Sequence, residues 1–342
     1  MDRKVKNIKE LAALIGISAT TVSRVLNGKA ELYRISPATS KKVLDAANEF
    51  SYYPDRIARG LRLKKTETLG LIIPDIANPF FASIAKTIEF ETRRKGYSLI
   101  LGDSLDDIQT ETELLNLFAG RKVDGIILAP VGQRSNHIEE FQKRGIPVLV
   151  IDRYLPGTKI PFVTTDNYAG ALEAVEYMIS KGHRIIACIQ GLKGISVNTD
   201  RVKGYRDALE KNNITADNLL ILGNDFGVEN GYIQTQILMN REKKPTAILA
   251  LSNLISIGVM RALSEKGLRI PDDVSIVSFD DQPYSAFLAS PMTTVEQLKE
   301  EIARIAVNGL LEWIITGKND QQINKMLKPK LIVRKSVKNI NG

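Results

Sequence analysis

A run of hydrogen-bonding side chains lies close to the N-terminus, between Ser18 and Arg24. Thr20, Thr21 and Ser23 carry hydroxyl groups, and Arg24 carries a planar guanidinium that can donate two parallel hydrogen bonds. Such an arginine matches O6 and N7 of guanine in the major groove of duplex DNA, and threonine can contact base edges or phosphates. These residue types predict a DNA-reading surface, although short helices with similar side chains also occur inside ordinary helical domains.

The elements that must position these side chains are two short helices, predicted at residues 8–15 and 19–26. Asn7 can cap the first helix, Gly16 can end it in a left-handed conformation, and Ser18 can cap the second. Apolar residues with helical spacing provide the contacts between the two helices: Ile8, Leu11, Ala12, Ile15, Ile17, Val22 and Val25. This is the spacing of a helix–turn–helix motif, in which the N-terminal end of the second helix enters the major groove.

A third helix and a basic connection complete the N-terminal segment. Residues 37–50 predict an amphipathic helix, whose expected core stripe is Val43, Leu44, Ala47 and Phe50. The connection before it, KAELYRI at residues 29–35, is longer than a tight turn needs. In residues 54–65, arginine and lysine side chains flank a few apolar ones. This composition is typical of a charged linker, or of a helix that forms only on DNA with Leu61 as a minor-groove wedge.

The positive charge of the chain is confined to this segment. The 342 residues carry a formal net charge of +8, and residues 1–66, with 14 Lys or Arg and 6 Asp or Glu, account for all of it. The asymmetry indicates a polyanion-binding head on a neutral body, or simply a solvated basic terminus. The sequence shows no membrane-spanning apolar run and no secretory signal, and its single cysteine, Cys188, suits a reducing compartment. We therefore expect a cytoplasmic protein without a membrane partner.

The body of the chain predicts two α/β halves. From residue 69, apolar strands such as LGLIIP and DGIILAP alternate with amphipathic helices, and the pattern restarts near residue 166. Continuous apolar strands between amphipathic helices indicate parallel sheets that are covered on both faces. Two such halves predict two subdomains with a cleft between them, and ligands in such folds bind beyond the carboxyl ends of the strands.

The residues that follow the predicted strands are mostly polar or aromatic: Asp75, Asn78, Phe80, Asp103, Asp152, Arg153, Asn253, Asp280 and Asp281. Carboxylates and amides pair with hydroxyl groups, arginine offers a planar fork, and a phenyl face suits a sugar ring. This set predicts a carbohydrate-type ligand. Asp and Asn after a strand also cap the next helix in many proteins, and Phe81 fits a core position as well as a pocket.

No group of residues predicts catalysis. The two histidines, His137 and His183, lack metal-ligand spacing, and the sequence contains no P-loop, GxGxxG or CxxC motif. We therefore expect a protein that is not an enzyme and that needs neither a metal nor a cofactor.

Taken together, these features resemble the lactose/galactose repressor (LacI–GalR) family of bacterial regulators. The resemblance rests on segments that occur in family order over nearly the whole chain: IKELAALIGISATTVSRVLNG, YYPDRIARGLR, TLGLIIPDIANPFFASIAKTIE, GYSLILGDS, VDGIIL, IPVLVIDR, KGHRIIACI, DRVKGY, PDDVSIVSFDD and MTTVEQ. It implies a three-helix DNA-binding domain at residues 1–53 and a hinge helix with linker at 54–66. Residues 67–342 are then an effector-binding and dimerisation core of two doubly wound parallel α/β subdomains, like a periplasmic sugar-binding protein.

The resemblance also implies roles for individual residues. Base reading falls to Ala19, Thr20 and Arg24, phosphate contacts to Asn7, Thr21, Ser23 and Tyr52, and the minor-groove wedge to Leu61 with Arg62 beside it. Effector contacts fall to Phe80, Arg153, Arg201, Phe226, Asn253 and Asp280, and the strand-end pattern adds Asp75, Phe81 and Asp103. Asn253 stands where many relatives have Asp, and the KAELYRI connection is longer than in relatives.

The resulting prediction is a sequence-specific transcriptional regulator, expected to be a repressor, whose affinity for double-stranded operator DNA is controlled by a small carbohydrate-type effector. Because no leucine heptad follows the C-terminal strand region, we expect a homodimer rather than a tetramer. One alternative is a sugar-binding receptor without DNA function, which the basic head and the missing signal peptide disfavour. The other is a sugar-processing enzyme, which the missing acid–base and phosphate motifs disfavour.

Overall fold

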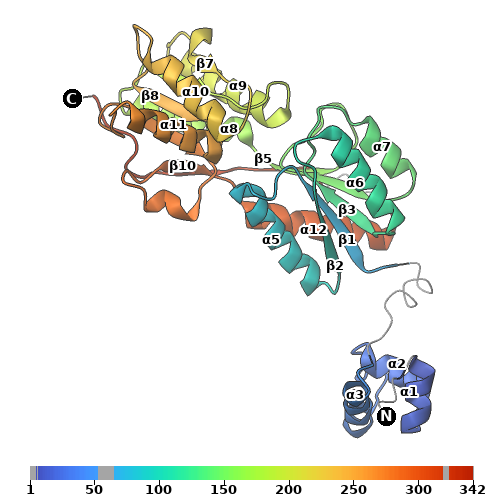
Figure 1. The fold of residues 1–342 in the computed structure, drawn as a ribbon. Coiled ribbons are helices and arrows are strands. Elements are labelled where there is room, and N and C mark those ends of the chain that lie inside the picture. The colour runs from blue at the N-terminus through green and yellow to red at the C-terminus, as the bar shows by residue number, and fades with distance from the viewer. Residues whose placement is uncertain (1–4, 6, 53–64, 319–322, 342) are drawn as a thin grey trace. The chain divides into compact units, whose positions relative to one another are not determined.

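The computed structural model describes residues 5, 7–52, 65–318 and 323–341, and the chain divides into two compact units, Met1–Thr66 and Glu67–Gly342 (Figure 1). The described part of the first unit is helical, and the second unit consists of two α/β subdomains. Leu61 and Arg62, together with most of the expected hinge helix, lie outside the described residues.

Three helices form the N-terminal unit: α1 (Ile8–Ile15), α2 (Ala19–Leu26) and α3 (Pro37–Glu49). Each begins at a side-chain cap, because Asn7, Ser18 and Ser36 each accept hydrogen bonds from backbone N–H groups in the first turn that follows. Gly16 ends α1 with a φ of 66°, a left-handed conformation that turns the chain toward α2. The predicted helix–turn–helix motif is confirmed.

The core of this unit is small and is shared by all three helices. Its buried side chains are Val5, Leu11, Ala12, Val22, Val25, Val43, Ala46 and Ala47. The prediction that Leu44 joins this core is wrong, because Leu44 is 48% exposed and Ala46 is buried instead. Helix geometry explains the difference: positions 43, 46, 47 and 50 share one face, whereas position 44 is turned by about 100° from position 43.

The first core subdomain contains a six-stranded sheet in the order β11-β5-β4-β3-β1-β2, with all pairs parallel. Its strands are β1 (Thr68–Ile73), β2 (Ser98–Asp103), β3 (Gly125–Leu128), β4 (Val148–Ile151), β5 (Phe162–Thr165) and β11 (Lys325–Leu327). Helices α5 (Pro79–Arg94) and α12 (Lys299–Thr316) cover one face, and α6 (Ile108–Gly120) and α7 (Asn136–Lys143) cover the other. Both faces of the inner strands are therefore buried, whereas the edge strands β2 and β11 are partly exposed.

The second core subdomain repeats this plan with the order β12-β10-β9-β8-β6-β7, in which only the β10–β12 pair is antiparallel. Its strands are β6 (Ile186–Ile189), β7 (Ile221–Leu222), β8 (Ala247–Ala250), β9 (Ser275–Phe279), β10 (Thr293–Glu296) and β12 (Lys330–Ile332). Its helices are α8 (Asn167–Ser180), α9 (Ser196–Lys211), α10 (Val228–Met239) and α11 (Asn253–Glu265). The prediction of two parallel α/β subdomains is confirmed.

Within the described part of the core, the chain passes between the two subdomains at three places. These crossovers follow β5, β10 and β11, so that α12 and β11 return to the first subdomain after the second has been built (Figure 1). The sequence pattern indicated only the first crossover, near residue 166. Because the crossovers join the sheets at one end, residues that follow β4, β5, β9 and β10 can lie close together although they are far apart in sequence.

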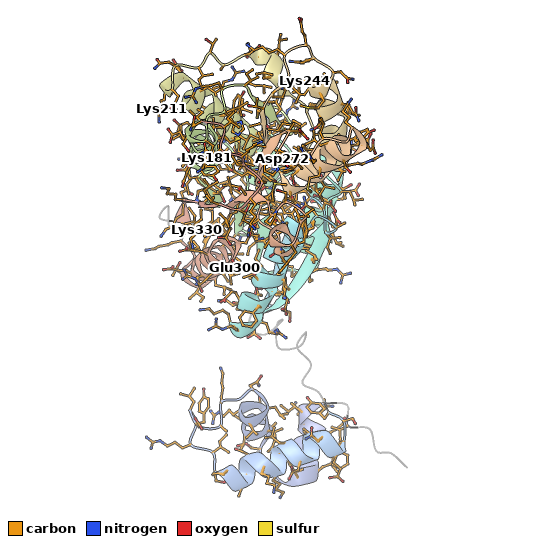
Figure 2. All side chains as sticks on the ribbon, turned by 90° about the vertical axis from the view of Figure 1, so that its left-hand side faces the viewer. Lys181, Lys211, Lys244, Asp272, Glu300 and Lys330 are labelled. Carbon is orange, nitrogen blue, oxygen red and sulfur yellow. The ribbon has the colours of Figure 1, made fainter. Side chains whose placement is uncertain are left out.

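Most charged side chains of the core lie at its outer surface, as Lys211, Lys244 and Glu300 do (Figure 2). A few do not: Glu111 is buried beside His137 and the N–H of Val131 in the first subdomain, and a further group of four, Asp152, Arg153, Arg201 and Asp280, is also buried. Fully buried charged residues are rare unless they are paired, and they concentrate at functional sites. These four residues therefore mark the place to look for a site.

Candidate functional site

The first candidate surface is the outer side of α2 in the N-terminal unit. Thr20 is exposed, Ser23 and Arg24 are partly exposed, and Val22 and Val25 on the opposite side are buried. This leaves Thr20 and Arg24, two of the predicted base-reading residues, on the solvent side of the helix, whereas the third, Ala19, is partly buried against the core of the head. This is the geometry that a helix needs in order to enter a groove with its polar face.

Several of the predicted phosphate contacts also have structural tasks in the head. The Asn7 side chain accepts hydrogen bonds from two N–H groups of α1 and donates to Oε1 of Glu10 at 2.8 Å. The Thr21 hydroxyl lies 2.8 Å from the Ser18 hydroxyl that caps α2. Tyr52 packs against the core of the head. These residues hold the helix ends in place, whatever further contacts they make.

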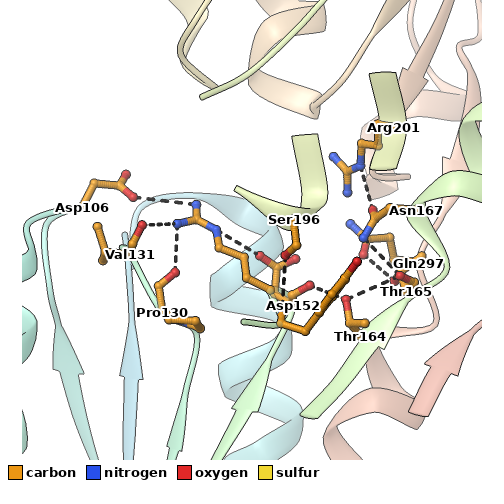
Figure 3. A network of polar contacts seen from close by, with 12 residues as sticks. Asp106, Pro130, Val131, Asp152, Thr164, Thr165, Asn167, Ser196, Arg201 and Gln297 are labelled. Carbon is orange, nitrogen blue, oxygen red and sulfur yellow. Dashed lines mark hydrogen bonds and ion pairs between the residues drawn. The ribbon is translucent and has the colours of Figure 1, made fainter. Parts of the chain in front are cut away.

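The second candidate site lies between the two core subdomains, where strand ends bring arginine and aspartate together (Figure 3). Arg153 follows β4, and its Nη1 donates hydrogen bonds to the carbonyl oxygens of Pro130 and Val131 at 2.9 and 3.1 Å. Its Nε lies 3.7 Å from Oδ2 of Asp152 and makes no hydrogen bond within the described residues. Arg153 is therefore fixed by the backbone of the first subdomain and by ion pairs with Asp152 and, at 4.0 Å from Nη2, with Asp106.

Arg201 occupies the corresponding place in the second subdomain. It projects from α9 and is only 2% exposed. Its Nε donates to Oδ1 of Asn167 at 2.8 Å, its Nη1 donates to the carbonyl oxygen of Leu251 at 2.5 Å, and the guanidinium lies 3.9 Å from the ring centroid of Phe279. Its Nη2 group makes no hydrogen bond to the described part of the protein. This rigid arginine can present that donor to a ligand.

Two aspartates share this space, one from each subdomain. Asp152 follows β4 and Asp280 follows β9, and both adopt left-handed backbone conformations, with φ of 63° and 70°. Such conformations are uncommon for residues other than glycine, and they cluster at functional sites. Burial raises the pKa of Asp152 to about 6, although Arg153 and Arg201 favour its charged form. Burial likewise lowers the pKa of Arg201, against the attraction of Asp280 and Asp152.

The Asp280 carboxylate is linked directly to a crossover between the subdomains. Its Oδ1 accepts a hydrogen bond from Nε2 of Gln297 at 2.5 Å, and Oε1 of Gln297 accepts one from the Thr165 hydroxyl at 2.6 Å. Gln297 follows β10 and Thr165 ends β5, and the bond between them is drawn in Figure 3. This chain of bonds therefore joins two of the three crossovers to the cleft. Sequence analysis missed Gln297 and Asn167, since no short-range pattern marks an amide at a crossover.

Four other predicted effector residues lie in the first subdomain and have partners within it. Asp75 accepts a hydrogen bond from the N–H of Ala77, and Asp103 accepts from those of Ile76 and Leu105, which ties together the loops after β1 and β2. The carboxylates of these two aspartates therefore have structural partners. Phe80 and Phe81 are buried in the core of the first subdomain, with ring centroids 5.1 Å apart in an edge-to-face arrangement.

Phe226 and Asn253 come from the second subdomain. The Phe226 ring lies against the backbone of Gly191, where an added Cβ would be 2.2 Å from ring carbons. Asn253 begins α11 and donates its backbone N–H to Oδ2 of Asp280 at 3.4 Å. Its buried side chain lies near Tyr284. Both amide atoms are buried, and neither makes a hydrogen bond of normal geometry within the described residues.

The two subdomains also touch across the cleft. The backbone N–H of Tyr154, beyond β4, donates to the Ser196 hydroxyl at 3.1 Å, and the Tyr154 hydroxyl donates to Asp200 at 3.2 Å. On the same pair of subdomains, Nε2 of Gln133 donates to the carbonyl oxygen of Lys193 at 2.9 Å. These bonds must break if the two core subdomains move apart, so they belong to one relative position of these subdomains.

The remaining reactive groups have structural surroundings. His183 is buried between the Thr246 hydroxyl and the Lys338 carbonyl oxygen, and burial lowers its pKa. Cys188 lies in β6, and burial raises the pKa of its thiol. Among the described residues, no group of three or more His, Cys, Asp or Glu side chains is arranged to hold a metal ion. No helix in the described ranges is long and apolar enough to span a membrane.

Known proteins share both parts of this architecture. A family model described as "Bacterial regulatory proteins, lacI family" matches residues 7–55, and one described as "Periplasmic binding protein-like domain" matches residues 175–337. The chain is 32% identical over 335 residues to "HTH-type transcriptional repressor PurR" of Actinobacillus pleuropneumoniae. The alignment covers 98% of this chain and 99% of that protein.

Solved structures agree with these matches. The lac repressor dimer bound to operator and the anti-inducer ONPF matches with a TM-score of 0.85 and 25% identity, over 98% of this chain and 100% of that chain. A complex of the transcriptional regulator CelR with cellobiose matches with a TM-score of 0.73 and 28% identity, over 97% and 100% of the two chains. A helix–turn–helix head and a periplasmic-binding-like core, aligned with repressors over nearly their full length, show that the chain belongs to the LacI family of bacterial regulatory proteins and is a DNA-binding transcriptional regulator.

Proposed function

We propose that this regulator binds its operator as a homodimer and that a small carbohydrate-type effector, held in the core cleft, controls the binding. Residues 1–53 then read the DNA, residues 54–66 act as the hinge, and residues 67–342 bind the effector and dimerise. The observation that carries the proposal is the buried guanidinium of Arg201, which faces Asp152 and Asp280 with one donor group unused.

The chemistry of the cleft suits a ligand rich in hydroxyl groups. The carboxylates of Asp152 and Asp280 accept hydrogen bonds, Arg153 and Arg201 donate them, and the amide of Asn253 can do both. Opposite charges balance locally, so the site does not require a strongly charged ligand. A relative, CelR, has been solved with cellobiose, a carbohydrate. These considerations support a sugar or sugar derivative in this chain as well.

On the DNA side, we assign base reading to Thr20 and Arg24 on the outer side of α2 and to Ala19 at its first position, which also packs against the core of the head. Arg24 is the strongest candidate for specificity, since a bidentate arginine distinguishes guanine from the other bases. Phosphate contacts from the head provide affinity that is independent of sequence and falls with salt. Two heads in a dimer then recognise two half-sites related by the symmetry of the dimer.

The coupling between the sites runs through the crossovers. A ligand that contacts Asp280 changes the surroundings of Gln297 and Thr165, and so favours one relative position of the two subdomains. The bonds of Tyr154 to Ser196 and Asp200 belong to the position described here. An effector acts by binding one of the two positions more tightly, and couplings of about 1–3 kcal/mol are usual.

The proposal is tested first by a thermal-shift screen of the full-length protein against neutral sugars, sugar acids and sugar phosphates. A ligand that binds the folded state raises the apparent melting temperature. Each sugar that raises it is then titrated into a gel-shift assay with duplexes selected from a random pool by the wild-type protein. A set of sugars that neither stabilises the protein nor changes DNA binding contradicts the carbohydrate assignment.

The role of Arg201 is tested with Arg201→Ala and a matched variant, Arg206→Ala. Arg206 lies on the same helix, but it donates to Asn218 at 2.7 Å rather than to a cleft residue. Loss of one or two charged hydrogen bonds weakens sugar binding by about 10- to 150-fold. We expect this loss in Arg201→Ala alone, with unchanged operator binding in the absence of sugar. A normal sugar titration of Arg201→Ala contradicts the assigned role.

A further inference from the structure

The connection between α2 and α3, residues 29–35, is a compact turn fixed to the head. The N–H of Lys29 donates to the carbonyl oxygen of Arg24 at 2.9 Å, and that of Tyr33 donates to the carbonyl oxygen of Lys29 at 3.2 Å. The N–H of Ile35 closes the turn onto the carbonyl oxygen of Ala30 at 2.9 Å. Ala30 and Ile35 both pack against the core of the head. The tip of the turn is therefore held in a defined position.

This turn places an aromatic ring against the expected base-reading arginine. The guanidinium carbon of Arg24 lies over the Tyr33 ring, 3.8 Å from its centroid. Tyr33 is 45% exposed, so the pair lies at the surface of the head. No hydrogen bond or ion pair engages the Arg24 guanidinium within the described residues. The ring is thus its principal contact in the described part of the protein.

Contact with an aromatic face leaves the donor groups of an arginine free. The attraction acts through the flat face of the guanidinium, whereas its N–H groups point outward in the plane. A long side chain that is held before binding also loses less conformational freedom when it binds. Tyr33 can therefore restrain Arg24 without occupying the donors that recognise O6 and N7 of guanine.

We propose that Tyr33 is a positioning residue that orients Arg24 for base recognition and so contributes to operator specificity. The inference rests on the proposed base-reading role of Arg24. It gives a function to the KAELYRI connection, which is longer than a tight turn needs and carries the ring to this place. Tyr33 acts through Arg24 and does not itself need to touch a base.

The experiment uses the full-length protein and a duplex selected from a random pool by the wild type, with a scrambled duplex as the non-specific probe. Tyr33→Leu keeps apolar volume but loses the aromatic ring, Tyr33→Ala loses both, and Tyr33→Phe keeps the ring. Leu32→Ala is the matched control, since Leu32 is a 73% exposed apolar residue of the same turn. Affinities are measured at one fixed salt concentration, because phosphate contacts depend strongly on salt.

We expect Tyr33→Leu and Tyr33→Ala to weaken binding to the selected duplex by about two- to five-fold, the range of an exposed cation–π contact. Binding to the scrambled duplex stays unchanged, and Tyr33→Phe and Leu32→Ala remain close to wild type. Repeated selection with Tyr33→Leu gives a weaker guanine preference at one position of each half-site. In an Arg24→Ala background, replacement of Tyr33 has no further effect on the selected duplex.

Three outcomes overturn the inference. Equal losses on both duplexes show that Tyr33 supports the fold or phosphate binding. A loss that persists in the Arg24→Ala background shows that Tyr33 does not act through Arg24. Unchanged or tighter binding by Tyr33→Leu shows that the ring does not assist Arg24. If Arg24→Ala itself leaves the selected duplex bound as before, the base-reading role of Arg24 fails, which is a failure of the proposed function and is distinguishable from the other three.

Discussion

Replacing Asp152 with asparagine is expected to stabilise the folded protein at neutral and alkaline pH. Burial raises the pKa of Asp152 from 3.8 to about 6. The folded state therefore holds a proton on this group more tightly than the unfolded state does, and wild-type stability falls as pH rises from about 4 to about 6. Above that range the charged carboxylate remains buried and continues to destabilise the fold. Asparagine is similar in shape, tolerates the left-handed backbone conformation at this position, and has no charge to bury.

The magnitude follows from the shift in pKa. A shift of about two units corresponds to about 3 kcal/mol of stability, fully expressed above pH 6. The pH-dependent part of the difference in free energy of unfolding between Asp152→Asn and the wild type should grow from about 0.5 kcal/mol at pH 4 to about 3 kcal/mol at pH 8, in favour of the variant. For a chain of this size, that is an increase of about 4 °C in melting temperature at pH 8. Melting curves at pH 4, 5, 6 and 8 without effector measure it directly.

Asp107→Asn is a control with the opposite sign. The Asp107 carboxylate caps α6 by accepting hydrogen bonds from the N–H and hydroxyl of Thr110 at 2.7 and 2.8 Å, and these bonds lower its pKa. Its charged form stabilises the fold, so neutralising it reduces stability at pH 8 and has less effect at low pH. A raised pKa of Asp152 is refuted if Asp152→Asn is no more stable than wild type at pH 8, or if its gain in stability is the same at every pH.

Three further predictions concern the cleft, the division of the chain and the hinge. Gly191→Ala should displace the Phe226 ring and weaken effector binding, whereas Gly120→Ala, whose added Cβ meets nothing within 4 Å, should not; equal titrations for both variants would contradict the placement of Phe226 at the site. Removal of residues 1–66 should leave a folded, effector-binding dimer, as measured by thermal shift and sedimentation; an unfolded or monomeric product would contradict the division into units. Leu61→Ala, at a position outside the described residues, should weaken binding to the selected duplex more than to random DNA, and equal losses would exclude the wedge.

Much of this fold could be predicted because its signals are local. A capping side chain such as Asn7 or Ser18 acts on N–H groups two or three positions away, so the limits of α1 and α2 are visible in the sequence. Apolar strands and amphipathic helices repeat at short intervals, which predicts parallel sheets. Leu44 shows the limit of such patterns, because a one-residue difference in the choice of helix face changes a core residue into an exposed one.

The cleft could be predicted only in part. The positions after strands pointed to Arg153, Asn253 and Asp280, but the same pattern also selected Asp75 and Asp103, whose carboxylates accept hydrogen bonds from nearby backbone N–H groups. Strand ends mark the correct edge of a sheet. They do not distinguish a side chain that faces the other subdomain from one that stabilises its own loop.

The sequence by itself determined the basic head, its helix–turn–helix, the two α/β halves and the family, because these depend on composition and on spacings of a few residues. Only the tertiary structure decided which polar groups form the site. Arg201 is fixed by Asn167 and Leu251, which are 34 and 50 residues away, and Gln297 joins Asp280 to Thr165 across 17 and 132 residues. Burial between the two subdomains also raises the pKa of Asp152. Such contacts exist only in the folded chain, since no local spacing encodes a partner many residues away, and the Gln297–Thr165 contact also needs the crossovers that join the two sheets.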